Sequence, residues 1–167
     1  MLLTRGRRVV AEAVIKKDLL KDLMGVDTKD LFEMRQISNA GSFLAGSANN
    51  GSHTPNGLAA MFIATGQDAA DISESQAAVT YSQLLGNGDY YWSVTLTSLI
   101  VGTIGGGTAL ATQRECLDML GCRGEGKADK FAEICAGVAL AGETSLASAV
   151  LHGDWVSSHE RLGRHHA

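Results

Sequence analysis

Three groups of residues, far apart in the chain, are suited to chemistry. Asp68 is a carboxylate in the run Gly-Gln-Asp-Ala-Ala. Residues 102–108, Gly-Thr-Ile-Gly-Gly-Gly-Thr, form a glycine-rich loop whose bare backbone can approach a phosphate or a nicotinamide. His159 follows a long apolar stretch, and an imidazole exchanges a proton near neutral pH. We expect these three groups to converge around one cavity.

Each group also has a plain structural explanation. A lone Asp near a helix end is usually solvated or a capping residue. The loop at residues 102–108 is not the GxGxxG of a dinucleotide fold and lacks the Lys of a phosphate-binding loop, so it also fits a tight turn. The chain holds five histidines, so position alone gives His159 little weight. His53 and Asn56 fit a loop histidine and an ordinary helix N-cap.

The first third of the chain predicts short elements. Residues 9–15 have the pattern of a strand, and residues 16–23 that of a surface helix. Asp27 or Thr28 can cap a helix over residues 29–37. Residues 38–56 are rich in Gly, Ser, Asn and Ala, which fits either a loop or small-residue backbone packed closely against a ligand.

The remaining elements must position the three groups. Asn56 caps a predicted helix with the apolar spacing of Leu58, Met61, Phe62 and Thr65, and Asp68 falls near its end. Residues 77–85 and 90–99 alternate around Gly-Asn-Gly-Asp, which indicates a β-hairpin leading into the glycine loop. Two helices complete the pattern, and the fold class is therefore α+β. The first has a Thr112/Glu115 capping box and stops at Gly121; the second is a long helix, residues 130–152, buried on most sides.

Composition narrows the class of protein. The 167 residues suit one domain, and 45% hydrophobic against 19% charged residues indicates a globular chain. A net charge of −4 gives no reason to expect nucleic-acid binding. Three cysteines without CxxC spacing predict buried reduced thiols in a cytoplasmic protein and no metal site. Residues 131–151 are apolar, but Glu133 and Glu143 would be costly in a membrane, so we expect a soluble chain.

In this order and spacing, the three groups closely resemble the C-terminal part of the class I hydroxymethylglutaryl-CoA (HMG-CoA) reductases. The resemblance runs from Arg5-Gly6-Arg7 to Arg164 and includes residues 142–147, Gly-Glu-Thr-Ser-Leu-Ala, with Ser158-His159 beyond them. It implies a single partial catalytic domain, residues 1–167. This domain would be the C-terminal part of the family's large, substrate-binding domain, with its β-hairpin and long buried central helix.

The resemblance also implies roles for individual residues. Asp68 would be catalytic, hydrogen-bonded to a lysine and a glutamate of the family, and His159 would protonate the departing CoA thiolate. The residues matching the NADPH-binding positions are Ile104, Gly105, Gly106, Gly107 and Arg164. The residues matching the substrate pocket are His53, Asn56, Ser145, Leu146, Ala149 and Val150.

The sequence departs from the family at two places that matter for activity. It starts past the family's small NADPH-binding domain and the loop with its catalytic lysine, so we expect the dinucleotide motif, the lysine and a catalytic glutamate to be absent. Ile37 stands where the family has a substrate-binding lysine. Arg35 is the nearest cation, and two residues along a helix would point it elsewhere.

The implied reaction is NADPH-dependent reduction of HMG-CoA to mevalonate and CoA, as in isoprenoid biosynthesis, with this chain inactive alone. The alternatives are a non-catalytic fragment, a piece that assembles with a separate N-terminal half, and a module that binds CoA esters without turnover. The family builds its active site at a dimer interface. Together with the apolar long helix, this predicts a homodimer or a higher oligomer.

Overall fold

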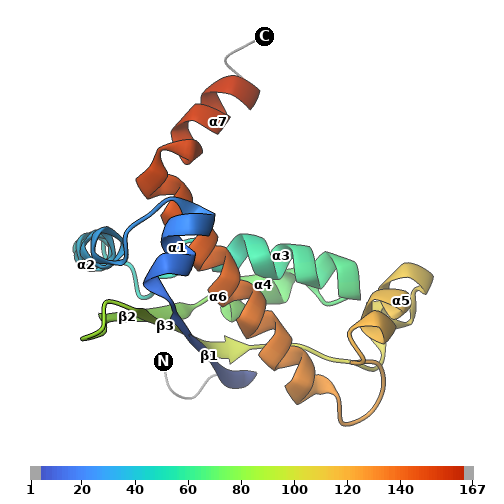
Figure 1. Ribbon diagram of the computed structural model, residues 1–167. Coiled ribbons are helices and arrows are strands. Elements are labelled where there is room, and N and C mark those ends of the chain that lie inside the picture. Colours follow the sequence, from blue (N-terminus) through green and yellow to red (C-terminus); the bar gives the residue numbers. More distant parts are fainter. Residues whose placement is uncertain (1–4, 164–167) are drawn as a thin grey trace.

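The computed structural model describes residues 5–163, in which helices cover one face of a small antiparallel sheet (Figure 1). The strands are β1 (Arg7–Ile15), β2 (Ala78–Leu84) and β3 (Tyr90–Leu99), in the order β1-β3-β2. The predicted first strand and the hairpin are both confirmed. The hairpin turn closes through a hydrogen bond from Leu85 N to Asp89 O (2.8 Å), and Gly88 there has a φ of 86°. That left-handed backbone explains the glycine in the turn.

Helices make up most of the remaining chain. The α-helices are α1 (Lys17–Met24), α2 (Thr28–Leu44), α3 (Thr54–Thr65), α4 (Ile72–Ser75), α5 (Ala111–Met119), α6 (Ala128–His152) and α7 (Asp154–Leu162). Two short 3-10 helices are η1 (Ala69–Asp71) and η2 (Gly106–Ala109). In Figure 1, α6 crosses the sheet diagonally, α5 lies near its N-terminal end, and α7 projects from its C-terminal end. The fold is therefore a mixed α and β arrangement, as the sequence predicts.

The predicted boundaries of α2 and α3 are wrong. The helix predicted over residues 29–37 continues to Leu44, so residues 38–44 of the stretch rich in Gly, Ser, Asn and Ala are helical. In this added part Asn39 accepts a hydrogen bond from Asn50 (2.9 Å), a tertiary contact that offsets the weak helix propensity. The next helix begins at Thr54, so Asn56 is not its N-cap.

The capping box predicted for α5 is also wrong. The helix begins at Ala111, which places Thr112 inside its first turn rather than before it. The Thr112 hydroxyl donates to the neighbouring Gln113 side chain (2.8 Å) instead of accepting from a helix N–H group. The three-residue spacing of Thr112 and Glu115 is therefore coincidental.

Two clusters of buried side chains form the core on the inner face of the sheet. The larger one joins α3, β3, α5 and α6 and includes Phe62, Val94, Leu96, Leu117 and Phe131. The smaller one joins α1, α2 and β3 and includes Leu20, Leu31, Tyr90 and Trp92. Leu140 of α6 packs against both clusters. The alternation predicted for β3, with Trp92, Val94 and Leu96 inward, is confirmed.

The long helix is confirmed, but not its burial on most sides. A single stripe of α6 is buried, against β1, β3 and α3, while Gly137, Ala141 and Ser145 on the other side are exposed. Among the described helices, α6 alone is long and apolar enough to cross a membrane (mean hydropathy 1.6). The buried core helix of a globular protein can have the same length and hydropathy, so these two properties are weak evidence for a membrane span. The small residues on the exposed side of α6 made the sequence of this helix apolar nearly all round. We therefore expected a larger part of its surface to be buried than the structure shows.

The cysteines give a prediction about this core. Cys122 and Cys135 are fully buried, Cys116 is partly exposed, and all three are free thiols. Burial raises the pKa of Cys135 to about 12, which keeps it as an unreactive thiol. In the native chain at about pH 8, iodoacetamide should modify Cys116 and spare Cys122 and Cys135 until denaturant is added. Mass spectrometry of the labelled chain checks this, and rapid native labelling of all three would contradict the buried positions.

Candidate functional site

Asp68 and the glycine-rich loop lie in one pocket, as the sequence predicts. The pocket has a volume of about 610 Å³. Asp68 comes directly after the end of α3, where Gly66 turns the chain with a φ of 72°. It caps η1 by accepting a hydrogen bond from Ala70 N (2.9 Å), and its side chain is exposed. The residues that line the pocket with it include Phe62, Ile63, Gln67, Ile104, Gly105, Gly106, Gly107 and Gln113.

Two close contacts hold the loop against the end of α3. The backbones of Gly66 and Gly107 cross so closely that a Cβ atom on either would collide with the other's carbonyl group. Gln67 pairs with Gly102 on both sides, donating to its carbonyl (3.0 Å) and accepting from its N–H (2.8 Å). Because Gly66 and Gln67 directly precede Asp68, these contacts fix the position of Asp68 relative to the loop.

The exposed part of the loop is bare backbone. Gly105 and Gly106 have φ values of 80° and 53°, and a Cβ atom at either would meet nothing within 4 Å. Thr108 steadies the loop by donating its hydroxyl to Gly105 O (2.6 Å). Ile104 is largely exposed beside them. An open pocket beside uncovered backbone is suited to a flat ring or a phosphate group, which needs close approach to N–H groups.

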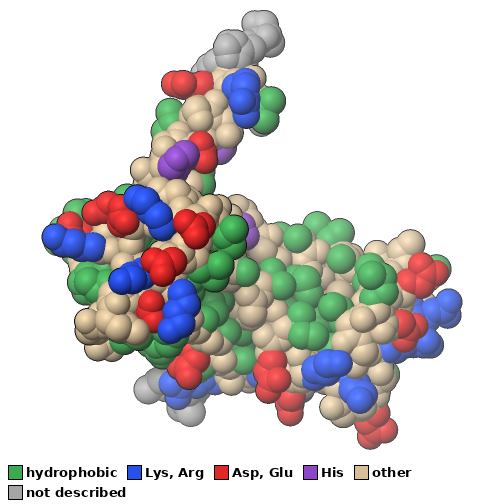
Figure 2. All heavy atoms as spheres, viewed as in Figure 1, with side chains coloured by type: hydrophobic (Ala, Val, Ile, Leu, Met, Phe, Trp, Pro, Cys, Tyr) green, Lys and Arg blue, Asp and Glu red, His purple; other side chains and the backbone are tan. Residues whose placement is uncertain are grey.

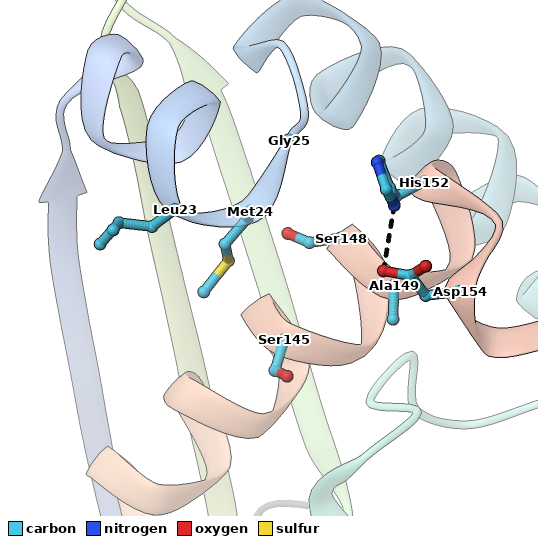
Figure 3. A pocket seen from close by; sticks show the side chains of 8 residues that line it. All are labelled: Leu23, Met24, Gly25, Ser145, Ser148, Ala149, His152 and Asp154. Carbon is cyan, nitrogen blue, oxygen red and sulfur yellow. Dashed lines mark hydrogen bonds and ion pairs between the residues drawn. The ribbon is translucent and has the colours of Figure 1, made fainter. Parts of the chain in front are cut away.

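The predicted substrate residues of α6 face two different hollows. Leu146 and Val150 line an apolar groove of about 460 Å³, together with Arg35, Trp155 and Val156. Ser145 and Ala149 line a neighbouring hollow of about 390 Å³ beside Met24, Ser148 and His152 (Figure 3). Successive helical residues point about 100° apart, and here Ser145 and Leu146 line different hollows. The groove therefore contains only part of the predicted set.

Glu143 is the residue that the sequence analysis missed. It is fully buried in α6 and holds the N-terminus of α3, accepting hydrogen bonds from His53 N (2.6 Å), Thr54 N (2.9 Å) and the Thr54 hydroxyl (3.0 Å). Its other oxygen accepts from Arg35 of α2 (3.0 Å), and both side chains are almost completely buried. One carboxylate thus joins three helices. The signal in the sequence that could have identified it is a charged residue within an otherwise apolar helix, because a buried charge needs a partner.

Arg35 is held by two partners. Besides its ion pair with Glu143, its guanidinium lies 4.5 Å from the centre of the Trp92 ring, a cation–π contact. The expectation that Arg35 would point away from the direction of Ile37 agrees with the structure, because Arg35 is buried and Ile37 is largely exposed. Arg35 lines the apolar groove, and Glu143 neutralises its charge there.

His53 and Asn56 separate in the structure. The His53 ring lies against the bare backbone of Gly142, where any side chain would collide with it, and its Nδ1 atom is buried. Asn56 is exposed on the first turn of α3, and Glu143 accepts the N–H groups of His53 and Thr54 at the start of that helix. Neither residue lines the pocket of Asp68 or the groove.

His159 lies apart from Asp68 within the chain. It is exposed on α7, which stands clear of the body at the far end of α6 from α5 (Figures 1 and 2). Its Nδ1 atom bonds to the carbonyl of Trp155 (2.6 Å). His159 lines neither the pocket of Asp68 nor the groove. Arg164 lies outside the described residues. One chain therefore brings Asp68 and the glycine-rich loop together but not His159. The catalytic roles of Asp68 and His159 stay predictions.

Comparison with known proteins identifies relatives over nearly the whole chain. The family model described as hydroxymethylglutaryl-coenzyme A reductase matches residues 1–164. A 3-hydroxy-3-methylglutaryl-coenzyme A reductase of Aeropyrum pernix is 47% identical over 98% of this chain, and one of Pyrococcus abyssi is 40% identical over 98%. A rice protein, 3-hydroxy-3-methylglutaryl-coenzyme A reductase 3, is 43% identical over 96%. The chain spans 40%, 41% and 30% of these relatives, respectively.

The crossing of Gly66 and Gly107 predicts a sharp dependence on glycine. Gly66→Ala should destabilise the chain by about 1–3 kcal/mol through backbone strain alone, and contact with Gly107 adds to this. Gly102→Ala is the matched control, because its Cβ would meet open space. Urea unfolding measures the stability, and hydrogen exchange of the Gly102 amide reports on the loop. Equal effects of the two substitutions would count against the crossing.

The Glu143 carboxylate predicts a large loss of stability on truncation. Glu143→Ala should cost about 3–5 kcal/mol, because it leaves the Arg35 charge buried and unpaired. It also removes the acceptor for three donors at the start of α3. Arg35→Ala should cost less, since those three hydrogen bonds remain.

The control for this pair is Lys21→Ala. Lys21 pairs with Asp27 at 2.8 Å, but both side chains are more than half exposed, so little change is expected. Chemical unfolding of the three variants provides the comparison. If Glu143→Ala unfolds at the same denaturant concentration as Lys21→Ala, the buried carboxylate does not stabilise the junction.

Proposed function

Because the chain belongs to the hydroxymethylglutaryl-coenzyme A reductase family, we propose that it supplies the C-terminal part of a catalytic domain that reduces HMG-CoA to mevalonate and CoA. The observation that carries this proposal is the pocket shared by Asp68 and the glycine-rich loop. In this proposal residues 1–167 are one part of the large, substrate-binding domain. The remaining catalytic groups, including a lysine, come from a segment beyond this chain or from another polypeptide.

The proposed cofactor is NADPH, held at Ile104, Gly105, Gly106 and Gly107, with Arg164 as a further contact. The bare, exposed backbone of Gly105 and Gly106 beside an open pocket supports this assignment. Bound NADPH supplies the hydride for the reduction. The backbone of the loop contacts the cofactor closely. Gln67, through its two hydrogen bonds with Gly102, fixes the distance between the loop and Asp68.

Asp68 is proposed to act as a carboxylate that steadies a cationic lysine beside the substrate carbonyl. Among residues 5–163, no lysine lines its pocket, and its carboxylate accepts only the Ala70 N–H bond, so it is available to such a partner. A carboxylate near a lysine favours the charged form of the lysine. Losing a donor that stabilises developing oxyanion charge costs several kcal/mol of barrier, so the chain alone should turn over very little.

The acyl part of the substrate is proposed to contact the apolar groove through Leu146 and Val150. Ser145 and Ala149 in the neighbouring hollow, with His53 and Asn56 near the start of α3, complete the proposed binding set. His159 is proposed to donate a proton to the CoA thiolate. Because His159 stands on α7, away from Asp68, the proposal places the two in one site only when two chains assemble (Figure 1). A homodimer or higher oligomer follows, and free buried thiols support a cytoplasmic setting.

Complementation tests the proposed reaction. The chain is mixed with a separate polypeptide carrying the N-terminal part of the Aeropyrum pernix relative, and NADPH oxidation and thiol release are followed with HMG-CoA. Turnover is expected only in the mixture. In that mixture Asp68→Asn and His159→Gln should each lower kcat roughly 10²–10⁴-fold, the range of general acid–base contributions. Asp22→Asn, an exposed carboxylate on α1, should leave kcat unchanged.

The second candidate function is a module that binds CoA esters without turnover. It is favoured by one observation, the apolar groove of about 460 Å³ lined by Leu146, Val150 and Trp155. Calorimetric titration with HMG-CoA distinguishes the two. Binding that Leu146→Asp abolishes, with no turnover in either the chain or the mixture, would leave the binding module as the function.

A further inference from the structure

Trp155 connects the apolar groove with the imidazole of His159. The two residues are one turn apart on α7, and their ring centres lie 4.3 Å apart with an angle of 33° between the ring planes. Residues four apart on a helix face each other, and aromatic contacts at this distance are attractive. The same indole lines the groove beside Leu146 and Val150. The exposed ring of His159 is therefore held against an indole whose other contacts are with the groove.

A hydrogen bond fixes which nitrogen of His159 carries the proton. Nδ1 lies 2.6 Å from the carbonyl oxygen of Trp155, and a carbonyl oxygen can only accept. Nδ1 must then be the N–H donor in both the neutral and the protonated imidazole. Nε2 is left as the nitrogen that gains and loses a proton. An isolated histidine favours the opposite neutral tautomer, with the proton on Nε2, so this contact selects the less common form.

From these two contacts we propose that Trp155 is a positioning residue for His159, which keeps the imidazole in the Nδ1–H tautomer and leaves Nε2 free. This rests on the proposed function for the identity of the proton acceptor. In the step concerned, the Nε2–H bond of the imidazolium breaks, an S–H bond forms on the thiolate, and neutral imidazole and free thiol result. The neutral product is already the tautomer that Trp155 holds, so the ring need not reorganise.

The experiment measures the tautomer directly and needs no turnover. The full 167-residue chain is labelled with ¹⁵N in its histidines and studied by NMR at about pH 9, well above the ordinary imidazole pKa. Long-range ¹H–¹⁵N correlations distinguish a protonated from an unprotonated ring nitrogen, and His159→Gln identifies the signals. The wild-type chain should show mainly the Nδ1–H form of His159.

Three variants separate the aromatic contact from other effects. Trp155→Leu keeps bulk and helix propensity but removes the ring, and should lower the ratio of Nδ1–H to Nε2–H tautomer roughly two- to tenfold, the factor that an aromatic contact supplies. Trp155→Phe keeps a ring and should restore most of the ratio. Val156→Ala, the adjacent position that also lines the groove, should not change it. Amide shifts of residues 154–162 check that α7 stays helical.

The outcomes distinguish this inference from the proposed function. A wild-type His159 that is mainly Nε2–H, or a tautomer ratio unchanged in Trp155→Leu, overturns the role of Trp155 whatever the activity of the mixture. If Trp155→Leu loses α7, the Phe variant decides, because loss of the Nδ1–H form in a helical Phe variant also overturns it. The expected tautomers without turnover in the mixture would sustain the positioning role and refute the reductase assignment.

Discussion

The structure depends most on one buried carboxylate. Glu143 lies in the middle of an apolar helix, where an unpaired charge would cost several kcal/mol in desolvation. It is tolerated because Arg35 neutralises it and because the start of α3 provides three hydrogen-bond donors. The same contacts that satisfy the charge join α2, α3 and α6. The arrangement of these helices follows from the need to pair Glu143, and the apolar groove between α2, α6 and α7 lies directly above it.

A second constraint operates at the opposite end of α3. There the chain needs two glycines, Gly66 and Gly107, because their backbones cross without room for a side chain. Gln67 adds a two-way hydrogen-bonded pair with Gly102. α3 is thus anchored at its start by Glu143 and at its end by the glycine loop. Both contacts fix the position of Asp68, which directly follows Gln67. Asp68 therefore lies beside the glycine loop although the loop is far from it in sequence.

The predicted site residues divide between the two ends of α6. Asp68 and the loop occupy one end, near α5, and the groove and the α7 arm occupy the other (Figure 1). α7 carries His159 on a helix with little cover, where Trp155, Val156 and Leu162 are exposed (Figure 2). Within one chain, therefore, the pocket of Asp68 and the arm that carries His159 lie apart. The chain spans about two fifths of the length of its archaeal relatives.

Local patterns in the sequence were sufficient for the strands, the hairpin and the long helix, because alternation and turn glycines act over a few residues. The resemblance to a known family brought Asp68 and residues 104–107 into one hypothesis. The extent of α2, the start of α3 and the one-sided burial of α6 depended on tertiary contacts. Glu143, 87 residues from Asn56, accepts the N–H groups at the start of α3, and in the added part of α2 Asn39 accepts a hydrogen bond from Asn50. Such long-range pairing leaves no periodic trace in a sequence, so only the tertiary structure decided it.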